Sequence, residues 1–331
     1  MESAPLGDDV LGDDPGALEL QTLAAEMTGK EAALWFPTGT MANQAALGCQ
    51  TRPGDAIVAD AEAHILYYEV GAPAALWGLM TWTVEGEAGI PHVGRIAGRI
   101  TGENLHTPGV SLLCLEDTHN RAGGAVVPLA RLREIRSLAD EHGIPVHLDG
   151  ARVMNAVAAG GGTLRQIAAT VDTLTICLSK GLGAPAGTVL CGASHKIEAA
   201  TRLRKRLGGG MRQIGGLCAA GSYALRHQAE RLREDHARAR RLADELQEIS
   251  GLRVTRPETN IVLLETSEPA ADWQKALEAE GVLCLPAAKN RLRMVTHHDV
   301  DDEGIARAVA AVQTVAGTLR GSPRAAALSS A

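Results

Sequence analysis

The sequence predicts an α/β protein with a mostly parallel sheet sandwiched by helices, followed by a smaller α+β C-terminal domain. Short apolar runs alternate with helical patterns over residues 16–190, an order that gives parallel strands with helices on both faces. From residue 252 the order changes to two strands, a helix, two strands and a helix. We expect an N-terminal arm at 1–15, a large domain at 16–240, a small domain at 241–318 and a disordered tail at 319–331.

Composition narrows the class of protein. The net charge is −7 without a long basic block, and aromatic residues make up only 2%, so nucleic-acid and membrane-surface binding are not expected. The six cysteines are scattered with no CxxC pair, which favours reduced thiols in the cytoplasm over disulfides or a metal site. No signal peptide and no apolar stretch of membrane-spanning length is evident.

The N-terminal elements predict an anion site. After the acidic arm, a helix is expected at 16–28 and a strand at 32–36, followed by a turn at Thr38, Gly39 and Thr40 and a helix over 41–49. Free amide groups and the helix dipole meet where such a helix begins. The turn is therefore a candidate phosphate site.

The remaining elements follow from their apolar periods and from glycine and proline breaks. Residues 71–110 are glycine-rich and show no clear pattern. Strands are expected at 56–59, 111–116, 144–148, 174–178, 252–256, 260–265, 282–286 and 291–296, and helices at 129–142, 163–169, 194–207, 211–249, 270–281 and 302–318.

Lys180 follows a buried strand within a stretch of small residues. Lysine is almost never fully buried without a partner or a function, and a desolvated lysine has a lowered pKa and becomes an amine nucleophile. Lys180 is therefore a candidate for a Schiff base. The alternative is a surface lysine in a turn.

Other polar residues also follow predicted strands: the turn at 38–40, His119, and Asp149 with Arg152. Ligands of such sheets bind at the carboxyl ends of the strands. If the ligand is pyridoxal phosphate, Lys180 holds its aldehyde and Asp149 pairs with the pyridine nitrogen, so that the ring acts as an electron sink.

In this hypothesis the residues at 38–40 bind the phosphate, His64 stacks on the ring, and Arg152 and Arg293 fork onto a substrate carboxylate. Each residue has a structural alternative when taken singly: a turn for Asp149, a satisfied histidine for His64, and salt bridges for the two arginines. Their occurrence together with Lys180 favours the cofactor.

Several motifs together resemble the low-specificity L-threonine aldolases, which are fold-type-I pyridoxal-phosphate enzymes of the β-eliminating lyase group. The resemblance covers residues 7–318. It is carried by HLDGAR at 147–152, CLSKGLGAP at 177–185, GGGMRQ at 208–213, GDDV at 7–10, PTGTMAN at 37–43, AH at 63–64, EDTHN at 116–120 and RMVTH at 293–297.

The resemblance implies the same roles for Lys180, Asp149, His64, Arg152 and Arg293, and it adds three residues. His119 stands where the family has a second active-site histidine near the substrate hydroxyl. Lys205 and Arg212 flank the glycine turn at 208–210, where family members bring basic residues toward a neighbouring subunit's active site. A homotetramer, built as a dimer of dimers with shared active sites, is implied.

The implied reaction is retro-aldol cleavage of L-threonine and L-allo-threonine to glycine and acetaldehyde. Either His119 or His64 could be the base that takes the hydroxyl proton. Two alternatives remain open: another pyridoxal-phosphate reaction, such as β-elimination, racemisation or phenylserine cleavage, and a catalytically silent protein. Family members usually carry a segment ahead of the GDDV-like stretch that supplies a serine near the substrate carboxylate, whereas six residues precede Gly7 here.

Overall fold

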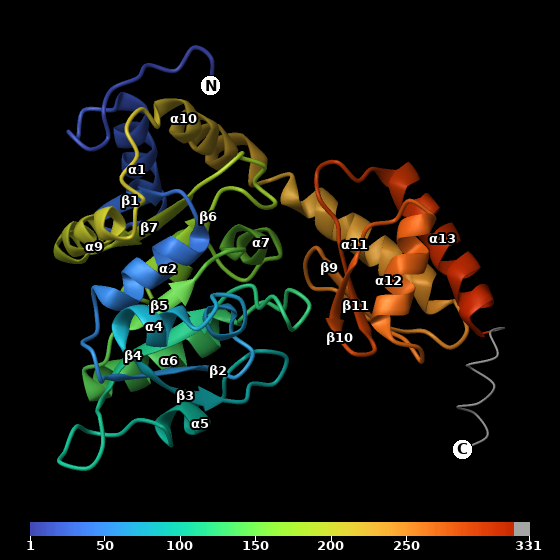
Figure 1. Ribbon diagram of the computed structural model, residues 1–331, viewed down its shortest axis with the longest axis horizontal. Helices are drawn as coiled ribbons and strands as arrows, with labels where there is room; N and C mark the ends of the chain where they lie inside the picture. Colours follow the sequence, from blue (N-terminus) through green and yellow to red (C-terminus); the bar gives the residue numbers. More distant parts are fainter. Residues whose placement is uncertain (321–331) are drawn as a thin grey trace. The chain divides into compact units, whose positions relative to one another are not determined.

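The computed structural model describes residues 1–320, and the chain divides into two compact units, Met1–Glu230 and Arg231–Ala331. Figure 1 labels their elements. The domain boundary expected at residues 240 and 241 falls within helix α11 (Leu232–Gln247), which lies wholly in the second unit. The division at residues 230 and 231 is not marked in the sequence, because the charged helical pattern continues across it.

The first unit is built on a seven-stranded sheet with the order β1-β7-β6-β5-β4-β2-β3. Its strands are β1 (Ala32–Phe36), β2 (Ala56–Asp60), β3 (Met80–Val84), β4 (Val110–Glu116), β5 (Val146–Asp149), β6 (Thr173–Cys177) and β7 (Thr188–Gly192). Strands β3, β2, β4, β5 and β6 pair in parallel, and β7 runs antiparallel to both β6 and β1. The predicted mostly parallel sheet is confirmed.

The helices of the first unit connect these strands. They are α1 (Pro15–Thr28), α2 (Gly39–Gly48), α3 (His64–Tyr67), α4 (Ala72–Trp77), α5 (Val93–Ala97), α6 (Leu129–His142), α7 (Val153–Ala158), α8 (Leu164–Ala168), α9 (Ser194–Arg206), α10 (Gly215–Tyr223) and the π-helical turn η1 (Ala224–Gln228). Buried alanine and leucine side chains of α2 and α9 pack on Leu34 and Phe36 of β1. Since alternate strand residues face the same side, these helices cover one face of β1.

Helix α1 shows how local chemistry defines an element. Asp14 is its N-cap and accepts a hydrogen bond from the Ala17 amide, Pro15 occupies the first turn, and Gly29 ends the helix in the left-handed conformation with φ 72°. These are the start and stop signals expected of a helix. Four short helices, α3, α4, α5 and α7, were not predicted because each spans only four to six residues, too few for a period to be visible.

The second unit contains a four-stranded antiparallel sheet with the order β10-β11-β9-β8. Its elements after α11 are β8 (Arg253–Thr255), β9 (Ile261–Glu265), α12 (Ala270–Ala279), β10 (Leu285–Ala288), β11 (Arg291–Val295) and α13 (Asp302–Arg320). Helix α13 extends past residue 318, so residues 319 and 320 are helical rather than part of a tail. The rest of the tail predicted at 319–331 lies outside the described residues.

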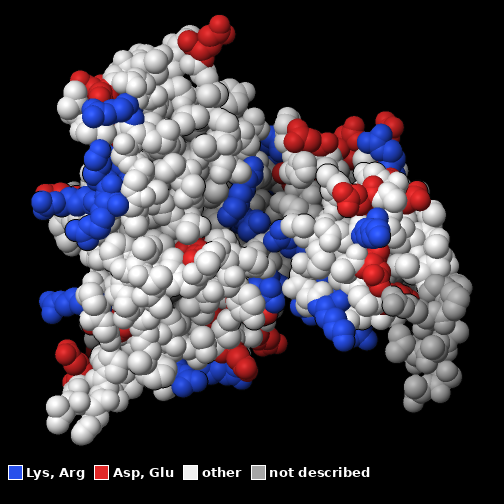
Figure 2. Space-filling model, in the orientation of Figure 1, with Lys and Arg blue, Asp and Glu red and all other residues white. Residues whose placement is uncertain are grey.

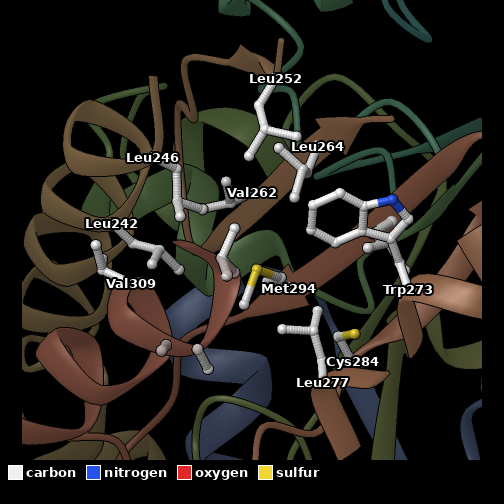
Figure 3. Packing of buried hydrophobic residues seen from close by; sticks show 14 of the residues in the cluster. Leu242, Leu246, Leu252, Val262, Leu264, Trp273, Leu277, Cys284, Met294 and Val309 are labelled. Carbon is white, nitrogen blue, oxygen red and sulfur yellow. The ribbon is translucent and has the colours of Figure 1, made fainter. Parts of the chain in front are cut away.

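Apolar side chains that recur at helical spacing in the helices and at alternate positions in the strands form the core of this unit. Figure 3 shows Leu242 and Leu246 of α11 meeting Val262 and Leu264 of β9, with Trp273 of α12 beside them. All of these side chains are almost completely buried. The second unit therefore has a hydrophobic core of its own.

Within residues 1–320, no helix combines the length and the apolar character that crossing a bilayer requires.

Candidate active site

The carboxyl ends of the parallel strands carry the charged residues of the site. Asp60 ends β2, Glu116 ends β4 and Asp149 ends β5, and Glu116 and Asp149 are register partners in the sheet. All three carboxyl groups are buried. Because buried charges need partners, the surrounding residues are arranged to supply them.

Asp149 lies at the centre of this cluster. Its Oδ2 accepts a hydrogen bond from Asn43 Nδ2 at 2.8 Å, and its Oδ1 accepts one from the Ala151 amide at 3.0 Å. Burial alone would raise the pKa of Asp149, but the positive charges of Lys180 and His64, with the Asn43 hydrogen bond, outweigh it and lower the pKa. Asp149 is therefore anionic at neutral pH, as a partner for a protonated pyridine nitrogen must be.

His64 begins α3 and faces the same cluster. Its Nδ1 lies 3.0 Å from Glu69 Oε1 and 3.9 Å from Asp149 Oδ2, and its backbone amide donates to Glu116 Oε2 at 2.7 Å. Burial lowers the pKa of His64, but the hydrogen bond to Glu69 and the charges of the neighbouring carboxylates raise it above its ordinary value. Within the described chain, no hydrogen bond engages Nε2 of this ring.

His119 occupies a more enclosed position. Its side chain is only 1% exposed, and its Nε2 lies 3.2 Å from Asp60 Oδ1, a distance suited to an ion pair although the angle is poor for a hydrogen bond. The Ala122 amide donates to Nδ1 at 3.3 Å. A Cβ on Gly89 would lie 2.3 Å from the ring, so only glycine fits there.

The pKa of His119 is also displaced from its ordinary value. Burial lowers it, but the carboxylates of Asp60 and Glu116 raise it above that value. Both ring nitrogens of His119 are thus turned toward the protein.

Lys180 is exposed, so the desolvation expected from the sequence is wrong for this structure. Strand β6 ends at Cys177, and the chain then turns back into the antiparallel β7 through bonds from the Leu178 amide to Gly187 O and from the Gly183 amide to Lys180 O. This loop places Lys180 on its outer side. The charge of Lys180 nevertheless lowers the pKa of Asp149, so the two residues are close enough to belong to one site.

The turn at residues 38–40 forms the start of α2. Thr38 is the N-cap, and its hydroxyl accepts from the Met41 amide at 3.2 Å. The first-turn amides, which include those of Gly39 and Thr40, have no partner within a helix. Thr188 Oγ1 is buried beside Gly39 and, within residues 1–320, has no hydrogen-bond partner.

These donors fit pyridoxal phosphate. The start of α2, with an unsatisfied buried hydroxyl beside it, suits a phosphate, and the buried anionic Asp149 suits a pyridinium nitrogen. Ligand atoms of His64, Glu69 and Asp149 lie within 4.8 Å of one another. However, the Asn43 amide group donates to both carboxylates, so these residues are satisfied without a metal ion.

The predicted basic residues are distributed over both units. Arg152 is the N-cap residue of α7, and Arg293 lies on β11 of the second unit. Lys205 is exposed in the last turn of α9, where Figure 2 shows Lys and Arg side chains gathered at the left of the view. Arg212 pairs with Asp8 of the N-terminal arm at 2.8 Å. Their roles toward a ligand stay predictions.

Sequence reasoning assigned no role to Asn43, Glu69, Glu116 or His147, all of which are buried in the cluster. Their partners are remote in the sequence, since Asn43 and Asp149 are 106 residues apart. No local pattern marks Asn43 and Glu69, whose contact joins residues 26 apart in the sequence. Asn43 lies four residues after Gly39, on the same helix.

The chain resembles known proteins along most of its length. The family model described as beta-eliminating lyase matches residues 1–269. The low specificity L-threonine aldolase of Escherichia coli (strain K12) is 41% identical over 312 residues, covering 94% of this chain and 92% of that protein. Alanine racemase TOXG of Cochliobolus carbonum is 34% identical over 313 residues, covering 89% of this chain and 78% of that protein.

Solved structures agree with the fold. The structure of Leishmania major threonine aldolase matches with a TM-score of 0.79 at 21% identity, covering 92% of this chain and 91% of that one. This similarity confirms the aminotransferase-like fold, and the sequence similarity confirms the predicted resemblance. The chain belongs to the beta-eliminating lyase family and is an enzyme of the lyase class.

Proposed function

We propose that this enzyme is a pyridoxal-phosphate-dependent aldolase that cleaves L-threonine and L-allo-threonine to glycine and acetaldehyde. The observation that carries the proposal is the anionic Asp149, buried beside His64 and within the field of Lys180. The identity to a low specificity L-threonine aldolase supports the choice of substrate. When bound, pyridoxal phosphate supplies an electron sink for the bond that breaks.

The protein residues have separable roles in this proposal. Lys180 holds the cofactor covalently, Asp149 keeps its ring nitrogen protonated, and the start of α2 (Thr38, Gly39 and Thr40) binds its phosphate. Arg152 and Arg293 bind the substrate carboxylate, and Lys205 and Arg212 serve the site of a neighbouring subunit. These assignments rest on residue chemistry and on the family motifs.

The geometry favours His64 over His119 as the group that takes the proton of the substrate hydroxyl. Nε2 of His64 has no protein partner in residues 1–320, whereas the enclosed ring of His119 has one nitrogen facing Asp60 and the other facing the Ala122 amide. A base needs a nitrogen that reaches the reacting group. His119 would then act by shaping the site beside His64.

Release of acetaldehyde from L-threonine and L-allo-threonine tests the proposal. The purified holoenzyme should release aldehyde and glycine in equal amounts, and Lys180→Ala should lose both the activity and the visible band of bound cofactor. Lys275→Ala, at a lysine on α12 of the second unit, is the matched control. An unchanged band in Lys180→Ala would contradict the assignment of that lysine.

A second candidate is racemisation, because an alanine racemase is among the relatives of this chain. Incubating the holoenzyme with L-alanine and measuring the D-enantiomer separates the two activities. Racemisation without aldehyde release would replace the aldolase proposal. Neither activity, with cofactor bound, would support a catalytically silent protein.

The pH profile tests the role of His64. Since the Glu69 carboxylate raises the pKa of His64, the neutral base forms only above the ordinary histidine pKa of 6.5. We expect the rising limb of kcat/KM against pH to move to lower pH in Glu69→Gln. Glu62→Gln removes a carboxylate that pairs with Arg121 instead and should leave the limb in place. An unmoved limb in Glu69→Gln would exclude His64 as the titrating base.

We further propose a cytoplasmic homotetramer. Leu6, Leu11 and Leu18 of the N-terminal arm and α1 are 49–73% exposed, and contact with another subunit would remove these apolar side chains from water. All six cysteines are free thiols, as in proteins of a reducing compartment. Analytical ultracentrifugation should give a species of four chains, and a monomer at micromolar concentration would contradict the assembly.

A further inference from the structure

The carboxamide of Asn43 joins two buried carboxylates. Asn43 lies in α2 and is 2% exposed. Its Nδ2 donates to Asp149 Oδ2 at 2.8 Å and to Glu69 Oε1 at 2.9 Å. Both amide hydrogens are thereby used, one on each carboxylate.

The oxygen of the same amide is also fully used. Asn43 Oδ1 lies 3.3 Å from Thr175 Oγ1 and 3.3 Å from His147 Nε2. The Gly150 amide donates to Thr175 Oγ1 at 3.1 Å, so the hydroxyl hydrogen of Thr175 is available to Asn43. Asn43 thus makes four contacts, which is the full capacity of a carboxamide.

The proton on His147 can be assigned in the same way. Burial lowers the pKa of His147 to about 4, so the ring is neutral near pH 7 and carries one hydrogen. Gln50 Nε2 donates to Thr173 Oγ1 at 2.9 Å, and this hydroxyl, which can still donate or accept, lies 2.9 Å from His147 Nδ1. We assign the ring hydrogen to Nε2, where it donates to Asn43 Oδ1.

These contacts allow one orientation of the amide. If the carboxamide turned over, its oxygen would face two carboxylates that can only accept, so both of those contacts would become repulsive. The two carboxylates therefore fix the direction in which Asn43 donates, and Thr175 and His147 lie at its oxygen.

We propose that Asn43 is a positioning residue that holds Asp149 ionised, and separated from the charge of Glu69, so that Asp149 can pair with the cofactor's ring nitrogen. The inference rests on the cofactor of the proposed function. Asp149 and Glu69 are two like charges in a buried space, which favours protonation of one of them. His64 Nδ1, 3.0 Å from Glu69 and 3.9 Å from Asp149, offsets part of that repulsion. The two N–H donors of Asn43 lie between the carboxylates and stabilise both in the charged form.

Asn43→Asp tests the proposal because it keeps the size of the side chain and removes both donors. The hydrogen bond to a charged group that Asp149 loses corresponds to roughly a tenfold to hundredfold weaker binding of pyridoxal phosphate at pH 7.5. Equilibrium dialysis measures this change. The pH titration of the visible band of bound cofactor, followed in parallel, should also move.

A recovery at low pH distinguishes positioning from general damage to the fold. Below its pKa, the carboxyl group introduced by Asn43→Asp would be protonated and would regain one donor, so the deficit in cofactor affinity should narrow between pH 7.5 and pH 5.5. A purely structural defect would give the same deficit at both pH values. Circular dichroism of each variant checks that the fold is retained.

Two further variants complete the design. Thr175→Val removes one donor to Asn43 Oδ1 and leaves both carboxylates unchanged. It should weaken the binding of pyridoxal phosphate by less than Asn43→Asp does. Thr51→Val is the matched control: the Thr51 hydroxyl donates to Leu47 O at 2.9 Å and contacts neither Asn43 nor a carboxylate, so this variant should bind cofactor as the wild type does. If Asn43→Asp does not fold, the comparison of Thr175→Val with Thr51→Val carries the test.

The outcomes separate this inference from the proposed function. If the wild-type protein binds no pyridoxal phosphate, the proposed function fails. If it binds the cofactor and Asn43→Asp binds it equally well with an unchanged pH titration, only the role of Asn43 is overturned.

Discussion

His147 is a buried histidine whose protonation the fold opposes. Burial lowers its pKa from 6.5 to about 4, so the unfolded chain binds a proton at this residue over a pH range in which the folded chain does not. Stability from His147 is therefore fully present above pH 6.5 and is lost as the pH falls toward 4. The loss reaches about 3 kcal/mol of unfolding free energy.

His147→Gln should remove this dependence. Denaturant unfolding at several pH values between 7.5 and 4.5 should show a smaller loss of unfolding free energy in the variant than in the wild type. His142→Gln, at an exposed histidine of α6, is the matched control and should follow the wild type. Equal pH dependence in all three proteins would contradict a lowered pKa of His147 in the folded chain.

Chemistry at the residue scale was predictable where a residue type has few uses. Asp149 and Lys180 could be singled out because the end of a buried strand seldom carries such groups without a function. The structure brings His64 and Asp149 together, and the roles of all three residues stay predictions. The exposure of Lys180 could not be predicted, since it depends on the length of the loop that leads into β7. The roles of Asn43 and Glu69 were not predictable either, because they depend on contacts between residues far apart in the sequence.

Helices α1 and α10 approach each other through two glycines. A Cβ on Gly16 would lie 2.6 Å from Gly215 O, far inside the normal contact distance. Gly16→Ala should therefore destabilise the first unit by ~1–3 kcal/mol, the usual cost of overpacking. Thermal or denaturant unfolding of the holoenzyme measures the effect.

Gly94→Ala is the control for this substitution. Gly94 lies in α5 with open space around its Cα, so the added methyl group should be neutral or should stabilise by ~0.5–1 kcal/mol through helix propensity. If both substitutions have the same effect, the close approach of α1 and α10 is not a packing constraint.

Elements with strong apolar patterns were predictable, and those with weak ones were not. Strand β1 and helix α6 lie at the residues expected for them, since each is a run of clear period bounded by glycine, proline or a cap. Strand β3 lies in the unassigned stretch at 71–110. Its five residues, MTWTV, alternate apolar and polar side chains, but most of them are exposed or half-buried. So short a run within a glycine-rich stretch does not define a strand by itself.

The division into two units makes a prediction for the whole molecule. Leu264 of β9 is fully buried in the core of the second unit, so Leu264→Ala should cost about 2–5 kcal/mol there. Hydrogen exchange should show faster exchange of the β9 and β11 amides, with the amides of β4 and β5 unchanged. Leu283→Ala, at a residue that is 82% exposed, should leave both units unchanged. Equal acceleration in both units would mean that they unfold as one.

The boundary between the units was the least predictable feature of the whole molecule. Charge and periodicity continue through α11, and the break at residues 230 and 231 follows a π-helical turn that leaves no distinct pattern in the sequence. The fold class was predictable because it depends only on the order of strands and helices, which a local pattern records.

Helix α2 carries residues from both ends of the proposed cofactor site: the phosphate-binding turn at its start and Asn43, which bonds to Asp149. Gly39 stands at its start and Asn43 lies one turn later, about 6 Å along the axis. Spacing and rotational phase are thereby fixed together. Inserting one alanine between Thr40 and Asn43 would rotate the amide by ~100° away from Asp149, whereas the same insertion after Gly48 would leave both ends in phase. One helical turn of α2 therefore sets the separation between the phosphate-binding end and the Asn43 end of the proposed site, and the bound ligand must match that separation.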